Sequence, residues 1–209
     1  EVCCAEALVL SGREISVDEV MAEIEKDRPF YENSGGGVTF SGGEPLLQKD
    51  FLLATLKACV EAGLHTVVET AGNVPWESLM AIVPYTSLFL YDLKVMDDSL
   101  HRRATGTGNA RILDNLRKLS DRGAPVRIRI PVIPGVNNTS ENMTAVWNTV
   151  KEMSNVERVE LIPFHQMARD KYESLDLVYD IEDIPVIDKT KLDEWAAFFT
   201  ARGITAIVT

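Results

Sequence analysis

The sequence predicts an α/β fold, in which parallel strands are covered by helices. The main observation is that short apolar runs alternate with longer amphipathic stretches along the chain. Parallel neighbours need long crossover connections, and the amphipathic stretches provide them. The second observation is composition: 209 residues, 45% of them hydrophobic and 25% charged, can bury one sizeable core. We therefore expect a single α/β domain for most of the chain.

Each expected strand is an apolar run bounded by turn residues. These runs cover residues 37–40, 65–70, 87–94, 126–135, 156–165 and 204–209. The run at 87–94 is too apolar for a sheet that faces solvent, which favours parallel strands buried on both sides. In the next run Arg127 and Arg129 alternate with Val126, Ile128 and Ile130, so the arginines should share one face.

Each expected helix has an apolar stripe at helical spacing. Helices are expected at 48–62, around 76–82, at 109–123 and at 140–153. A further, final helix is expected to present Leu192, Trp195, Ala196 and Phe199 on one face. Asp50 should cap the first of them and Gly63 should end it. Cys59 lies on the apolar stripe of that helix and is expected in the core. His65 and His101 are expected at the surface.

The segment "NSGGGVTFSGGEPLLQ" carries the first candidate site residues, Gly42, Gly43 and Glu44. Doubled glycines indicate a positive φ angle or a backbone that a ligand approaches closely. A carboxylate behind them suits a cationic ligand such as an ammonium group, and the G-K-[ST] ending of a triphosphate loop is missing. The alternative is that Glu44 only interacts with the dipole of the helix that follows.

Other expected strands also end in polar residues. Asp92 and Lys94 point to the same face, where they either neutralise each other or hold a ligand carboxylate and a cation or hydroxyl. Glu69, Arg129 and His165 stand at further strand ends, and His165 taken alone is equally consistent with a core histidine and a ligand contact. Because the carboxyl ends of parallel strands meet on one face, these residues could build one site.

Charge and cysteine content limit the class of protein. A formal net charge of −11 disfavours broad binding to nucleic acid or to anionic membranes. The chain has no apolar run of membrane-spanning length and no signal-like start, and its three cysteines fit a reducing compartment. We therefore expect a cytoplasmic protein.

Taken together, the motifs resemble the radical S-adenosylmethionine (SAM) activating enzymes of glycyl radical enzymes, the pyruvate formate-lyase activating enzyme family. The matching segments are "GGGVTFSGGEPLLQ", "ETAG", "DLKVMDDSLHRRATGTGN", "RIRIPVIPG" and "ELIPFHQMARDKY", in order between Cys3 and Tyr172. The resemblance implies a partial (β/α)6 barrel that holds SAM against a [4Fe–4S] cluster. It also implies a glycyl radical enzyme as partner, from whose glycine hydrogen is abstracted, and a one-electron donor such as flavodoxin or ferredoxin.

The resemblance also implies roles for individual residues. Gly42, Gly43 and Glu44 would receive the amino group of SAM, and Lys94, in the Asp92-Leu93-Lys94 segment, would contact its carboxylate. Lys94 and Asp92 would be the catalytic pair. Asp92 and Glu69 would flank a monovalent cation, although the family has Asp where this chain has Glu69. Arg129, Pro131 and His165 would lie along the ribose and adenine.

One departure from the family pattern concerns the cluster. The sequence contains no C-x-x-x-C-x-x-C run, which supplies the radical cluster ligands in the family. By the resemblance, residues 1–12 are the remnant of a ferredoxin-like insert, where Cys3 matches the last cysteine of an auxiliary cluster and Cys4 replaces a proline. Residues 13–209 are then a partial barrel without its first strand and cluster loop, expected to be inactive alone. The alternatives are another radical SAM enzyme and a non-catalytic half-barrel binding module.

Overall fold

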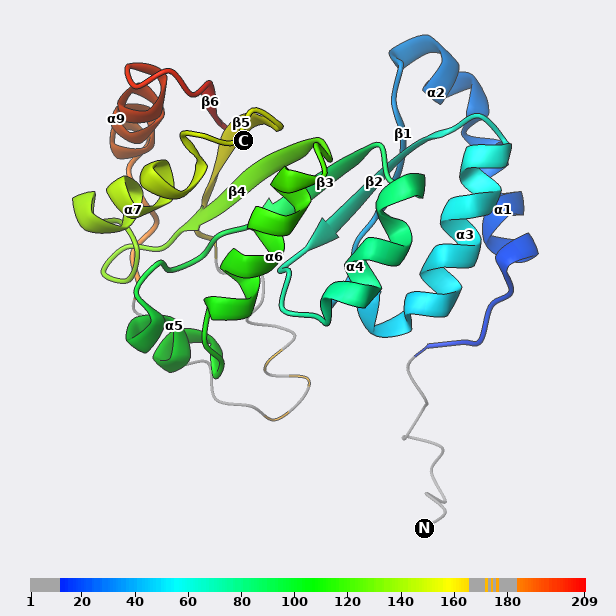
Figure 1. Ribbon diagram of the computed structural model, residues 1–209, viewed down its shortest axis with the longest axis horizontal. Coiled ribbons are helices and arrows are strands. Elements are labelled where there is room, and N and C mark those ends of the chain that lie inside the picture. The colour runs from blue at the N-terminus through cyan, green and yellow to red at the C-terminus, as the bar shows by residue number, and fades with distance from the viewer. Residues whose placement is uncertain (1–11, 166–171, 173, 175, 177–183) are drawn as a thin grey trace.

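The computed structural model describes residues 12–165, 172, 174, 176 and 184–209. Within these residues six strands form one parallel sheet, in which spatial order follows chain order from β1 to β6 (Figure 1). The strands are β1 Gly37–Phe40, β2 His65–Thr70, β3 Leu88–Asp92, β4 Val126–Val132, β5 Val156–Pro163 and β6 Ala206–Val208. The α/β prediction is confirmed, and each expected strand is present.

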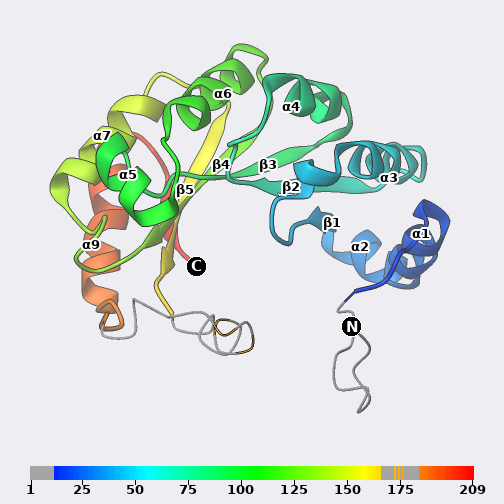
Figure 2. The same cartoon turned by 90° about the horizontal axis from the view of Figure 1, so that it is seen from below.

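Helices connect the strands. They are α1 Val17–Lys26, α2 Arg28–Ser34, α3 Lys49–Glu61, α4 Trp76–Ile82, α5 Asp98–Thr105, α6 Ala110–Asp121, α7 Ser140–Val150 and α9 Lys189–Thr200, with short 3-10 turns η1 Pro45–Gln48 and η2 Val83–Tyr85. Figure 2 shows α4, α6 and α7 on the convex side of the curved sheet. The carboxyl ends of the strands and the opposite, concave face are therefore where a site can form.

Alternation along β4 shows how the sheet separates its two faces. Val126, Ile128, Ile130 and Val132 are completely buried, whereas Arg127, Arg129 and Pro131 between them are partly exposed. The expected sharing of one face by the two arginines is confirmed. In register, Asp92 of β3 lies beside Arg129, and Glu160 of β5 lies on its other side. The face away from the helices therefore carries the charged side chains.

The start of α3 differs from the expectation. Asp50 lies inside the first turn, and the N-cap is Gln48, which makes no side-chain cap bond. The reason is that η1 precedes α3 directly, and Glu44 caps η1 by accepting from the Leu46 N–H. The expected end is confirmed, because the chain turns after α3 through Gly63 with φ of +72°.

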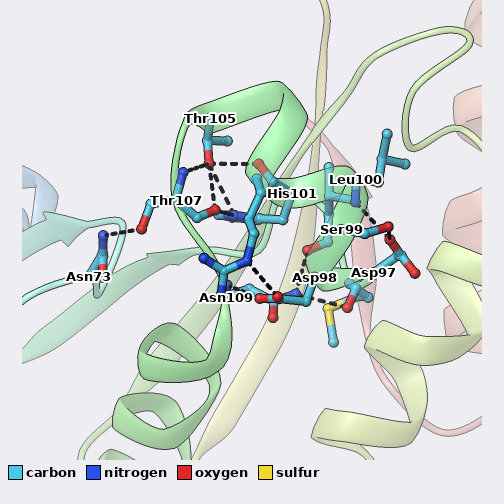
Figure 3. A network of polar contacts seen from close by, with 12 residues as sticks. Asn73, Asp97, Asp98, Ser99, Leu100, His101, Thr105, Thr107 and Asn109 are labelled. Atoms are coloured by element: carbon cyan, nitrogen blue, oxygen red, sulfur yellow. Dashed lines mark hydrogen bonds and ion pairs between the residues drawn. The ribbon is translucent and has the colours of Figure 1, made fainter.

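The histidine expectations were half correct. His65 is exposed at the first position of β2, as expected. His101 is not at the surface: only 3% of it is exposed, and its Nδ1 lies 2.7 Å from the Thr107 carbonyl oxygen. The loop between α5 and α6 folds back over the helix and buries it (Figure 3).

Helices α1 and α2 were not expected. The Ser16 side chain caps α1 and Glu19 completes a capping box. On its inner face Met21 and Ile24 pack with Cys59 and Leu64, and Cys59 is completely buried as predicted. Residues 1–11, with Cys3 and Cys4, lie outside the described residues, so their assignment to an insert stays a prediction. Within the described part of the chain, no helix has the length and apolar character of a membrane span.

Candidate functional site

The loop after β1 leaves open space above its glycines. Gly42 has φ of +130°, which favours glycine. Gly43 has no such requirement, and a Cβ built on it would meet no atom within 4 Å. Neither backbone conformation nor packing therefore explains glycine at position 43.

The Glu44 carboxylate is fixed by neutral donors from two strand ends. The Thr70 hydroxyl lies 2.9 Å from both carboxylate oxygens, and the Ala71 N–H donates to Oε2 at 3.1 Å. The Leu46 N–H donates to Oε1 at 3.3 Å, which is the helix-end role considered above. No ion pair found in the described part of the chain involves Glu44. Its negative charge is therefore held in place and available to a cation.

Asp92 and Lys94 face each other at the end of β3. The Lys94 Nζ lies 3.7 Å from Asp92 Oδ2, and 19% of the Asp92 side chain is exposed against 40% for Lys94. Leu93 between them is buried on the other face. Burial raises the pKa of Asp92, the nearby cations Lys94 and Arg129 oppose that rise, and the carboxylates of Glu69 and Glu44 add to it. These residues therefore form one electrostatically coupled group.

Glu69 and Arg129 form an ion pair across the concave face. The Nη1 atom of Arg129 contacts Oε1 of Glu69, and the Ser41 hydroxyl donates to Oε2 of Glu69 at 3.0 Å. The pair joins β2 to β4 over the intervening β3. Glu69 is the next-to-last residue of β2, as expected. Arg129 is not at a strand end but at the centre of β4, because β4 continues for three residues beyond the point where Asp92 ends β3. Each of the two already has the other as partner.

A cavity of about 200 Å³ opens beside Asp92 and Lys94. Its walls come from the ends of β2 and β3 and from the α5–α6 region: Ala71, Asn73, Asp92, Lys94, His101, Thr105, Thr107 and Ile112. Sequence reasoning did not single out Asn73 or Thr107, and it placed His101 at the surface. The signal that could have found two of them is the spacing in "DLKVMDDSLHRRATGTGN", which runs from Asp92 to Asn109.

Hydrogen bonds hold the loop after Lys94 in one arrangement (Figure 3). The Asn109 side chain donates to the carbonyl oxygens of Val95 and Met96 at 3.0 and 2.8 Å. Asp98 accepts the Asn109 N–H at 2.9 Å, and Asp97 caps α5 at Leu100. The segment that follows the Asp92–Lys94 pair is therefore rigidly supported.

Pro131 and His165 lie at the ends of β4 and β5. Pro131 is partly buried and its carbonyl oxygen accepts from the Asn137 side chain at 2.7 Å. His165 is exposed, two residues beyond the end of β5. The described residues that line the cavity beside Lys94 include neither Glu44 nor His165. A contact of His165 with a ligand stays a prediction.

The residues at these strand ends suit the methionine end of SAM better than they suit an iron–sulfur cluster. A fixed carboxylate, an open glycine and a lysine offer an acceptor for an ammonium group and a cation for a carboxylate. In contrast, the described residues hold no group of three or more His, Cys, Asp or Glu side chains placed to bind a metal ion. Cys59, the one cysteine among them, is buried beneath α1. The described residues therefore do not fit an iron–sulfur cluster.

Comparison with known proteins defines the class. Residues 3–145 match the radical SAM superfamily, and the chain belongs to it. Membership implies SAM and a [4Fe–4S] cluster as cofactors. A radical SAM methyltransferase from Sphaerobacter thermophilus has the same fold, with a TM-score of 0.69 over 94% of this chain and 58% of that one, at 18% identity.

Within the superfamily the relatives are activating enzymes. The chain is 39% identical to the pyruvate formate-lyase-activating enzyme of Clostridium pasteurianum, over 86% of this chain and 75% of that protein. It is 37% identical to the (2S)-3-sulfopropanediol dehydratase activating enzyme of Klebsiella oxytoca, over 98% of this chain and 66% of that protein. A domain of the pyruvate formate-lyase-activating enzyme of Bacteroides vulgatus superposes with a TM-score of 0.71 at 29% identity, covering 83% of this chain and 99% of that one.

The chain therefore belongs to the family of glycyl-radical-enzyme activating enzymes that includes pyruvate formate-lyase-activating enzyme. The resemblance read from the sequence is confirmed, and so is the partial barrel fold. The chain spans 75% of the length of the Clostridium pasteurianum relative and 66% of the length of the Klebsiella oxytoca relative.

Proposed function

We propose that this chain supplies the SAM-binding strand ends of an enzyme that activates a glycyl radical enzyme. The observation that carries the proposal is the Glu44 carboxylate, held by Thr70 and Ala71 beside an unfilled space over Gly43. A carboxylate so fixed, with a lysine and an aspartate at the end of β3, matches the two charged ends of an amino acid. Membership in the family supports the same assignment.

Each residue then has a stated task. Gly42, Gly43 and Glu44 receive the SAM ammonium group, and Lys94, after Leu93, binds its carboxylate. Asp92 and Glu69 supply oxygen ligands to a monovalent cation near that carboxylate. Arg129, Pro131 and His165 lie along the nucleoside. In the ligand-free structure Nη1 of Arg129 is paired with Glu69.

SAM held by these residues would supply the chemistry that removes hydrogen from a glycine Cα of the partner enzyme. This chain's residues bind and orient SAM and shield it from water. An auxiliary cluster at Cys3, a flavodoxin or ferredoxin as electron donor, and a cytoplasmic location complete the proposal. The net charge of −11 supports a partner other than nucleic acid or membrane.

Calorimetric titration of residues 1–209 with SAM and with SAM methyl ester tests the site. Lys94→Gln should weaken SAM binding about tenfold or more, because a charge-assisted contact contributes about 1.5–3 kcal/mol. The same substitution should change the affinity for the ester much less, since the ester has no carboxylate. The control is Lys118→Gln, because the Lys118 side chain is 41% exposed and also pairs with a carboxylate, that of Asp114. Equal SAM affinity in wild type and Lys94→Gln would remove the assignment.

A further inference from the structure

A second cavity, of about 390 Å³, lies on the rim of the sheet between the β3–α5 and β4–α7 connections. Its floor includes Val95 and Met96, which directly follow Lys94. Its other walls come from α5, from the segment before α7 and from α7 itself. The described residues that line it are Val95, Met96, Asp97, Leu100, Val136, Thr139, Glu141, Asn142 and Ala145.

The lining is mostly apolar with one acidic side. Val95, Met96, Leu100, Val136 and Ala145 offer hydrocarbon surface. Asp97 and Glu141 are exposed and acidic, and none of the described lining residues is basic. A matching occupant brings an apolar side chain into the cavity and places a cationic group beside these carboxylates.

Asn142 adds a polar requirement to the cavity. The residue is 8% exposed, and its Oδ1 accepts the Met96 N–H at 2.8 Å. Its Nδ2 is buried and has no hydrogen-bond partner among the described residues. A buried N–H without an acceptor is costly, so a carbonyl oxygen that reaches it by displacing the atoms that cover it would gain a bond while the Asn142–Met96 bond stays in place.

The cavity is also held in shape before anything binds. Asn109 fixes the Val95 and Met96 carbonyls, and Met96 in turn fixes Asn142. Thr139 caps α7 by accepting the Asn142 N–H at 3.2 Å. A preformed site loses little ordering entropy on binding.

We propose that this cavity docks a peptide segment of the glycyl radical enzyme, with an apolar side chain inserted, a carbonyl oxygen on Asn142 and a Lys or Arg beside Asp97 and Glu141. The identity of the partner rests on the proposed function. Val95 and Met96 line this cavity and directly follow Lys94, so the cavity adjoins the Asp92–Lys94 end of β3, to which such a partner brings its glycine. An acidic electron donor fits the Asp97 and Glu141 side poorly.

Blocked dipeptides test the chemistry of the cavity. ¹⁵N-labelled residues 1–209 are titrated with N-acetyl-Leu-Lys-amide, and N-acetyl-Leu-Glu-amide and N-acetyl-Gly-Lys-amide serve as charge and apolar controls. The expected result is a saturable downfield shift of the Asn142 side-chain amide protons with the first peptide, at millimolar concentration, and at least fivefold weaker binding of the other two. Glu141→Gln should reduce the preference for Lys over Glu.

Substitution on α7 tests the place. Ala145→Leu fills the cavity and should abolish the shift, whereas Thr144→Leu on the exposed side of the same helix should not. Unfolding temperatures of both variants are measured. If Ala145→Leu does not fold, Asn142→Asp, which keeps an acceptor for the Met96 N–H, replaces it, and peptide binding is then followed through the main-chain amide signals of Val95 and Met96. Binding of N-acetyl-Leu-Lys-amide to the cavity-filled variant with wild-type affinity would overturn the assignment.

Intact partners test the occupant. The candidates are pyruvate formate-lyase, isethionate sulfite-lyase and choline trimethylamine-lyase. Each appears in the name of an activating enzyme that is similar to this chain. For the enzyme that binds the wild-type chain most tightly, Ala145→Leu should lower the affinity at least tenfold, and Thr144→Leu should leave it unchanged. If none binds, or if Ala145→Leu changes nothing, the glycyl radical enzyme is not the occupant. None of these measurements needs SAM or a cluster, so SAM titration judges the proposed function separately.

Discussion

The side chain of Asn137 donates to the main-chain oxygen of Lys94 at 2.6 Å. The same amide donates to the Pro131 oxygen at 2.7 Å, and its own Oδ1 accepts the Ile133 N–H at 2.7 Å. Asn137 is completely buried. One side chain therefore fastens the end of β3, which carries Asp92 and Lys94, to the exit of β4, which carries Arg129 and Pro131.

Replacing this amide should be costly. Asn137→Leu leaves three partly buried main-chain groups without the Asn137 side chain as partner, and we expect a loss of about 3 kcal/mol in unfolding free energy. Urea denaturation followed by circular dichroism measures it. Asn148→Leu, at an exposed position of α7, is the control and should change stability by less than about 0.5 kcal/mol. Similar stability of the two variants would contradict the role given to Asn137.

Gly72, the glycine of "ETAG", is required by packing. A Cβ on it would lie 1.8 Å from the Tyr91 hydroxyl oxygen, and Tyr91 is completely buried with its hydroxyl bonded to the Ile112 oxygen. Gly72→Ala should therefore cost about 4 kcal/mol or more. Gly106→Ala separates the steric effect from backbone strain, because Gly106 also has a positive φ but an open Cβ position. That control should lose about 1–2 kcal/mol.

Gly43 should behave in the opposite way. Its Cβ position is open and its φ lies outside the left-handed region, so Gly43→Ala should keep its stability within about 0.5 kcal/mol. If SAM lies against this backbone, the added methyl group should lower SAM affinity about tenfold. Parallel denaturation and calorimetry check both statements. A stable Gly43→Ala variant with unchanged SAM affinity would place the ligand elsewhere.

Asp92 should make stability depend on pH. Burial raises the pKa of Asp92 above its ordinary value, so the folded chain holds this proton more tightly than the unfolded chain does. The ionised form therefore weakens folding, and this loss develops as pH rises from the ordinary carboxyl range through the raised pKa. Asp92→Asn lacks the effect, so its stability relative to wild type should increase over that pH interval. A difference that stays flat or shrinks with rising pH would be incompatible with a raised pKa.

Much of the fold could be predicted because it depends on local periodicity. The strands at 65–70 and 126–132 and the helix at 76–82 follow from apolar spacing and turn residues alone. The exceptions are features that tertiary structure decides. His101 stands in the polar stretch "SLHRRA", and it is buried because the following loop folds over it and bonds its ring.

The sequence predicts where the site residues lie, but not which of them pair with one another. That Glu44, Asp92 and Lys94 lie at or just beyond the carboxyl ends of their strands follows from the direction of the chain in a parallel sheet. The partners do not follow. Glu69 and Arg129 belong to strands separated by β3, and their pairing depends on the reach of two long side chains over the concave face. The contact of Asn137 with Lys94 joins residues 43 positions apart, beyond any local pattern.

Because Arg129 is paired with Glu69, its guanidinium already has a partner before any nucleoside binds. A ligand that draws Arg129 to itself strips Glu69 of its counter-charge, with only the Ser41 hydroxyl left to it. A small monovalent ion is the simplest replacement, because it restores neutrality without a long side chain. Engagement of Arg129 by a ligand and uptake of such an ion at Glu69 should then rise and fall together, as one exchange of partners.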